Sequence, residues 1–128
     1  MACPYEYQNI TDGWRKIGKG TGSNCDSSTD KFNGNTWFRF VEPAGKKLST
    51  TIPSKGSCGT SAVSWMEEDH PNRAGQVVDR KICFRWRDHC EWSIRNIKVV
   101  GCIGHNNEMF YLYKLKKTSV CSLGYCAV

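Results

Sequence analysis

Residues 109–115 read Met109-Phe110-Tyr111-Leu112-Tyr113-Lys114-Leu115, and the alternation of their side chains predicts a β-strand. Phe110 and Leu112 fall on one face of such a strand, and Tyr111 and Tyr113 fall on the other. One face can pack inward while the other stays near water. The stretch is therefore typical of an antiparallel sheet with one solvated face.

Three further segments, residues 36–41, 77–86 and 93–102, alternate or run apolar like strands and are bounded by turn residues. Residues 10–34 are instead rich in glycine, asparagine and other turn formers. Only residues 61–69 suggest a helix, of one or two turns. The sequence thus predicts a mostly β, irregular antiparallel domain with at most one short helix.

The length of 128 residues suits one domain, which we place at residues 1–128. The composition is 39% hydrophobic and 12% aromatic, so a few large rings must supply much of the buried area. We expect Trp37, Trp65, Trp86 and Trp92 to lie in the core.

The chain has eight cysteines, and none of them forms a Cys-x-x-Cys pair. Structural zinc sites normally need such pairs, so four disulfides are the favoured interpretation and a zinc site is the weaker one. Disulfides imply an oxidising compartment, hence a secreted or extracellular protein. The predicted fold is accordingly disulfide-rich.

No signal peptide is visible and no apolar run is long enough to cross a bilayer, so we expect no transmembrane segment. The formal net charge is +6, which favours encounter with anionic partners such as sulfated or sialylated glycans, although an ordinary basic surface explains it equally well. Nucleic acid is a poor candidate for a secreted chain.

The chain has few of the groups that catalysis requires, and we expect no enzyme, no cofactor and no metal. His70, His89 and His105 form no ligand motif, and oxidised cysteines offer no thiolate nucleophile. A Gly-x-Ser-x-Gly motif is absent. Clustered carboxylates at residues 67–69, 88 and 91 leave glycosidase chemistry as a minor alternative.

An ordered series of motifs resembles one family along essentially the whole chain. In the first half these are Cys3, Trp14-Arg15, Cys25-Asp26, Trp37-Phe38-Arg39-Phe40-Val41, Cys58-Gly59-Thr60-Ser61-Ala62, Trp65 and His70-Pro71. In the second half they are Gly75-Gln76-Val77, Cys83-x-x-Trp86, Cys90-x-Trp92, Ile97-Lys98-Val99-x-x-Cys102, Tyr111-x-Tyr113-x-Leu115 and Cys121-x-Leu123-x-Tyr125-Cys126. The chain resembles the eight-cysteine domain of the uromodulin and pancreatic zymogen-granule glycoprotein family.

The resemblance implies a disulfide pairing that the sequence alone leaves open. The implied pairs are Cys3 with Cys102, Cys25 with Cys121, Cys58 with Cys126, and Cys83 with Cys90. Two cysteines that pair with each other in uromodulin have no counterpart here, which leaves no unpaired thiol.

In mammalian members of the family the domain carries N-glycans that bacterial fimbrial adhesins bind. The acceptor asparagine of one such site, which precedes a His-Pro pair, has no counterpart between Trp65 and His70. The role of a glycan decoy therefore does not transfer at that position. Filament assembly does not transfer either, because it depends on a separate zona pellucida module.

Two further patterns are candidates for function. Asn9-Ile10-Thr11 is an N-glycosylation sequon in a loop-like segment. Strand alternation places Lys81, Arg85 and Arg87 opposite Ile82, Phe84 and Trp86, as a basic stripe that either binds acidic glycans or is simply a solvated face.

Two polar loops have the groups that a sugar-binding site requires, namely amides, carboxylates and imidazoles near aromatic rings. They contribute the candidate residues His105, Asn106, Asn107, Glu108, His70 and Asn72. We therefore expect a non-catalytic extracellular module that binds glycans or glycoproteins in a lectin-like or adhesive role. A protein–protein adhesion module, and a basic host-defence or toxin-like protein that acts on anionic surfaces, remain as alternatives.

Overall fold

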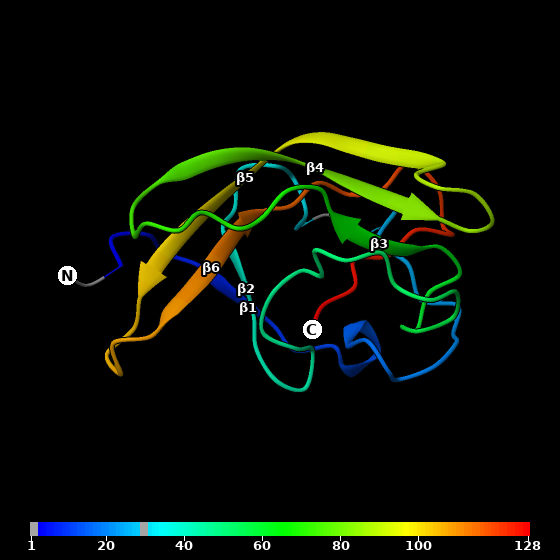
Figure 1. Ribbon diagram of the computed structural model, residues 1–128, viewed down its shortest axis with the longest axis horizontal. Helices are drawn as coiled ribbons and strands as arrows, with labels where there is room; N and C mark the ends of the chain where they lie inside the picture. The colour runs from blue at the N-terminus through cyan, green and yellow to red at the C-terminus, as the bar shows by residue number, and fades with distance from the viewer. Residues whose placement is uncertain (1–2, 29–30) are drawn as a thin grey trace.

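Six strands form one sheet in the computed structural model, which describes residues 3–28 and 31–128 (Figure 1). Along the chain the strands are β1 (Gln8–Ile10), β2 (Phe38–Phe40), β3 (Val63–Met66), β4 (Val77–Arg85), β5 (Trp92–Ile103) and β6 (Met109–Lys114). Their order across the sheet is β1-β2-β6-β5-β4-β3. The pair β1–β2 is parallel and all other neighbours are antiparallel. The predicted mostly β fold is confirmed, with one parallel pair at an edge.

The four strands expected from the sequence are all present. β2 lies within residues 36–41, and β4 fills residues 77–85 of the predicted 77–86. β5 and β6 cover the predicted segments 93–102 and 109–115 to within one residue at each end. Strands β4, β5 and β6 form the long twisted centre of the sheet, to which the shorter strands add on both sides (Figure 1).

The helix expected within residues 61–69 is wrong, because Val63–Met66 form β3 at the far edge of the sheet. β3 pairs antiparallel with β4, and Trp65 lies opposite Cys83. All four residues of β3 are buried, so apolar side chains fill both of its faces and the alternation that marks a strand is lost. In the part of the chain that the structure describes, the helical element is a single 3-10 turn, η1 (Gly13–Arg15).

Irregular segments cover both faces of the sheet, so the expected solvated face beside residues 109–115 is also wrong. Phe38, Phe40 and Tyr113 pack on one face against the main core, which includes residues from the loops around positions 32, 44–48 and 123–127. On the other face, Leu112 packs with Trp37 and with the segment that holds Cys3 and Tyr5. Tyr113 is fully buried as a result.

Four disulfides join these covering segments to the sheet and to each other. The pairs are Cys3–Cys102, Cys25–Cys121, Cys58–Cys126 and Cys83–Cys90, which coincide with those that the resemblance implies. The first three close long loops, with sequence separations of 99, 96 and 68 residues, and Cys83–Cys90 closes a separation of 7. Long loops gain the most from closure in the chain-entropy account.

The tryptophans divide between core and surface. Trp37 and Trp65 are buried as expected, and Trp92 is half-buried. Trp86 is 44% exposed, so its expected place in the core is wrong. β4 ends at Arg85, and Trp86 therefore lies in the turn beyond the strand, where alternation no longer directs a side chain toward the core.

A buried ion pair joins η1 to the C-terminal part of the chain. The guanidinium of Arg15 donates two hydrogen bonds to the carboxylate of Asp26, at 2.8 and 2.7 Å. The same carboxylate accepts the backbone N–H of Tyr125 at 2.9 Å, and Arg15 also donates to Asp12 at 3.0 Å. Each nitrogen of the Arg15 guanidinium thus has a partner inside the protein. We call this set the Arg15 cluster.

Candidate functional site

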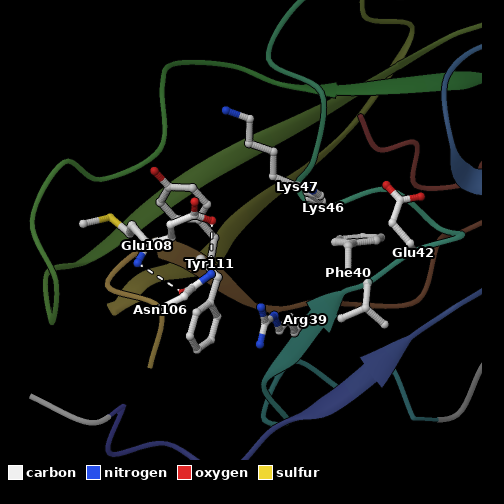
Figure 2. A pocket seen from close by; sticks show the side chains of 11 residues that line it. Arg39, Phe40, Glu42, Lys46, Lys47, Asn106, Glu108 and Tyr111 are labelled. Atoms are coloured by element: carbon white, nitrogen blue, oxygen red, sulfur yellow. Dashed lines mark hydrogen bonds between the residues drawn. The ribbon is translucent and has the colours of Figure 1, made fainter. Parts of the chain in front are cut away.

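A groove opens between the end of β2 and the turn that joins β5 to β6 (Figure 2). Its volume is about 470 Å³. One wall comes from β2 and the segment after it, and the other comes from the β5–β6 turn and the start of β6. The polar and aromatic side chains that line it are Arg39, Glu42, Lys46, Lys47, Asn106, Glu108, Phe110 and Tyr111. We call it the Arg39 groove.

Arg39 is the central residue of β2, and aromatic rings hold its side chain in place. Its guanidinium carbon lies 3.9 Å from the centroid of the Phe110 ring, in a cation–π arrangement. Its Nη1 donates a hydrogen bond to the hydroxyl of Tyr7 at 3.2 Å. Within residues 3–28 and 31–128 no carboxylate forms a salt bridge with Arg39. The guanidinium is thus oriented but keeps donors for a ligand.

A second hollow, of about 790 Å³, lies directly beside the groove. Arg39, Asn106 and Phe110 line both cavities, so these side chains separate the two. Tyr7 and the turn residues His105 and Asn107 line the second one, which we call the Tyr7 hollow. Arg39 is therefore accessible from two sides.

The β5–β6 turn supplies the polar residues that the sequence predicted. Its backbone closes through a bond from the Gly104 N–H to the Glu108 carbonyl at 2.8 Å. The side chains of Asn106 and Glu108 are joined, because the Asn106 amide donates to the Glu108 carboxylate at 3.3 Å (Figure 2). Asn107 takes a left-handed conformation, with φ of 62°, which asparagine tolerates well. The predicted candidates His105, Asn106, Asn107 and Glu108 are exposed on this turn.

Two lysines stand on the opposite wall of the groove. Lys46 and Lys47 are both exposed, and the described residues contain no salt bridge to either. Their backbone N–H groups donate to the carbonyl of Val128, at 2.7 and 3.2 Å, which fixes the loop. Glu42, on the same wall, pairs with Lys16 at 3.0 Å. The wall is therefore positively charged on balance.

His70 supports the groove from behind. Its ring centroid lies 4.3 Å from that of Tyr111, and its Nε2 is 2.6 Å from the Tyr113 hydroxyl. That hydroxyl accepts the Leu48 N–H at 3.1 Å, so its own O–H is free to donate to an unprotonated His70. Burial lowers the pKa of His70 to about 4, with help from Lys47 and Arg80. His70 thus positions Tyr111 and is uncharged at neutral pH.

The other predicted loop residue, Asn72, is exposed and lies apart from the Arg39 groove. It lines a third hollow of about 430 Å³ together with His70, Gln76 and Arg80. The stacked rings of His70 and Tyr111 connect this hollow with the Arg39 groove, because each ring lines one of the two.

The basic stripe expected at residues 81–87 is interrupted. A bulge between Arg80 and Ile82 shifts the register of β4, and Lys81 comes within 3.7 Å of the carboxylate of Glu67. Arg85 is half-buried. Arg87 lies beyond the strand with its guanidinium carbon 4.7 Å from the centroid of the Trp86 ring. None of these three basic residues lines a hollow described above.

Glu67 also approaches Cys83 and Cys90 closely enough to suggest a metal-binding group. Both sulfur atoms are joined in a disulfide, however, and a disulfide offers no thiolate to a metal ion. The cluster therefore gives no reason to invoke a metal.

Arg39 is the functional candidate that sequence reasoning missed. The segment that holds it was interpreted only as a strand, although a charged residue among Trp37, Phe38 and Phe40 was a visible signal. The contributions of Tyr7 and Phe110 had no local signal, because they depend on which strands become neighbours.

The model of the uromodulin-like domain family matches residues 38–127. The chain belongs to this family. Uromodulin of Rattus norvegicus is 32% identical over 94% of the chain, and the pancreatic secretory granule membrane major glycoprotein GP2 of the same species is 34% identical over 70%. The human GP2 protein is 28% identical over 95% of the chain.

This uromodulin-like domain spans only 17% of the length of each rat relative and 21% of human GP2. The family places the domain outside the cell, in agreement with its four disulfides. Among the described residues no helix has the length and apolarity to traverse a bilayer.

Proposed function

We propose that this uromodulin-like domain is a non-catalytic recognition module that binds acidic glycans, free or on glycoproteins, in the Arg39 groove. The observation that carries the proposal is the state of Arg39, which is oriented by two aromatic residues and lacks a carboxylate partner among the described residues. A guanidinium held in this way matches the paired oxygens of a carboxylate or sulfate.

The rest of the groove complements a sugar that carries such a group. Lys46 and Lys47 add positive charge on the wall that faces the turn (Figure 2). Phe110 and Tyr111 offer ring faces on which the apolar face of a sugar can stack. The Asn106 amide and the Glu108 carboxylate supply a donor and an acceptor for hydroxyl groups.

The carboxylates of the groove support binding better than glycoside hydrolysis. Hydrolysis needs one carboxyl group as a proton donor and a second as nucleophile or base. Glu42 is engaged with Lys16 and Glu108 with Asn106, so both are committed as ionised partners of donors. These contacts favour a role in orienting a ligand.

A glycan array tests the proposal, with the oxidised domain applied at low and at physiological salt. We expect selective binding to sulfated or sialylated glycans and a loss of roughly 10–100-fold in affinity for Arg39→Ala, as for a lost charge-assisted contact. Arg87→Ala is the matched control, because Arg87 also stacks on a ring but lines no hollow described above. Equal losses in both variants, or no glycan binding, would refute the proposal.

A protein partner is the second candidate, and the β4–β5 turn favours it. Trp86 is 44% exposed and carries Arg87 on its ring, a pair of residue types enriched at interface hot spots. The turn is rigid, because the Glu91 carboxylate accepts the N–H groups of Trp86, Arg87 and Asp88 and the Cys83–Cys90 disulfide closes it. These backbone bonds also lower the pKa of Glu91. Loss of binding to a protein ligand in Trp86→Ala, but not in Arg39→Ala, would favour this candidate.

A further inference from the structure

The sequon at Asn9-Ile10-Thr11 begins in β1, the strand at the edge of the sheet next to β2. Asn9 and Thr11 are exposed, whereas Ile10 is 1% exposed and belongs to the main core. The acceptor amide is thus accessible on a strand whose backbone is held by its neighbour.

The register of the sheet places Asn9 beside Arg39. β1 and β2 are parallel, with Asn9 opposite Arg39 and Ile10 opposite Phe40. Ile10 and Phe40 both enter the main core, so Asn9 and Arg39 belong to the opposite face. Tyr7 precedes Asn9 by two residues and reaches this same face, as its hydrogen bond from Arg39 shows.

The Tyr7 hollow lies next to this row of side chains. Its volume of about 790 Å³ is within the range of sites that hold small molecules. Tyr7 itself is 36% exposed, and Arg39, His105 and Asn107 offer hydrogen-bonding groups along the wall. The hollow therefore presents a ring face and polar groups close to a glycan acceptor.

We infer that an N-glycan on Asn9 folds back onto Tyr7, fills the Tyr7 hollow and covers one side of Arg39. The first N-acetylglucosamine stacks its apolar face on the phenol ring, and the following sugars lie against Arg39 and the β5–β6 turn. The domain thus carries a glycan on its own surface as an intramolecular ligand. Intramolecular attachment gives this sugar a high effective concentration at the hollow.

A consequence for regulation follows, and it rests on the proposed function of the Arg39 groove. Because Arg39 separates the two cavities, a glycan in the Tyr7 hollow competes for donors that an external acidic glycan needs. Occupancy and processing of Asn9 then set the affinity of the groove. Protein without the glycan binds external ligands more tightly.

The docking is tested without any external ligand. The domain is secreted from mammalian cells, occupancy of Asn9 is measured by intact mass, and the glycan is trimmed to one N-acetylglucosamine. We expect this sugar to raise Tm relative to Asn9→Gln by roughly 2–5 °C, and the gain to fall below about 1 °C when Tyr7→Ala is added to both proteins. Trp86→Ala, which removes an exposed aromatic on another turn, retains the gain.

An unoccupied Asn9, or an equal gain in Tm with and without Tyr7, would overturn the inference. The regulatory part is then measured with a heparin-derived sulfated oligosaccharide, which binds Asn9→Gln roughly 3–10-fold more tightly than the fully glycosylated protein. Equal affinities would overturn the competition. If Arg39→Ala leaves binding by Asn9→Gln unchanged, the proposed function fails, whereas the Tm result is unaffected.

Discussion

Arg15 and Arg39 are arginines of the same small domain that differ in their counter-charges. Arg15 is 2% exposed and its guanidinium is paired with Asp26 in two hydrogen bonds. Arg39 is half-buried and is held by Phe110 and Tyr7, with no carboxylate paired to it among the described residues. The first arrangement uses the donors of arginine within the fold, and the second leaves donors for another molecule. The position of the carboxylates thus separates a structural arginine from a binding one.

The disulfides offer the largest effect on this comparison. Cys25–Cys121 lies beside the Arg15 cluster, and Cys3–Cys102 lies beside the Tyr7 hollow. Their sequence separations are 96 and 99 residues, so the loop-entropy model predicts that replacing either pair by alanine lowers the free energy of unfolding by about 4–5 kcal/mol. Chemical denaturation measures both variants. Only the Cys3→Ala, Cys102→Ala protein should also lose affinity for sulfated glycans; a similar loss in both would blur the distinction between the regions.

Removing the carboxylate of the Arg15 cluster is the next largest test. Asp26→Ala leaves a buried guanidinium without its partner and the Tyr125 N–H without an acceptor, so we expect a loss of about 3–5 kcal/mol in the free energy of unfolding. Asp12→Ala removes the solvent-exposed partner of the same arginine and should lose only about 0–1 kcal/mol. Urea denaturation compares them. Similar values for the two variants would show that burial does not set the strength of this cluster.

The sequence predicted the central strands because their residues alternate or run apolar between turns, as in residues 109–115. It misassigned β3 because residues 62–66 are buried on both faces, which removes the period that separates strand from helix. β1 escaped notice because its residues are mostly polar and its strand conformation depends on pairing with β2. Such pairing is a non-local property that short-range patterns do not contain.

The candidate site was predicted in part. The polar turn at residues 104–108 was expected to bind sugars from its composition, and it does line the two cavities beside Arg39. The basic stripe at residues 81–87 was expected from alternation, but a bulge and the end of β4 interrupt it. Arg39 was not selected, because its significance depends on Tyr7 and Phe110, which are far from it in the sequence.

The smallest expected effect concerns His70, which supports the groove through Tyr111. Its pKa in the folded protein, about 4, is below the ordinary value of 6.5. The unfolded chain therefore takes up a proton on His70 before the folded protein does, and stability falls as the pH is lowered from about 6.5 toward about 4. Tm measured across this range should fall less steeply in His70→Gln than in the parent protein. Parallel curves for the two proteins would contradict the buried, uncharged state of His70.

The central claim is that Arg39 binds acidic glycans through its oriented fork of donors and not through charge alone. Titration calorimetry with a heparin-derived sulfated oligosaccharide compares the parent protein with Arg39→Lys and Arg87→Lys, all of which have the same net charge. We predict that Arg39→Lys weakens binding roughly 10-fold, because lysine lacks the planar fork, and that Arg87→Lys binds like the parent protein. Unchanged affinity in Arg39→Lys, or equal losses in both variants, would contradict the claim.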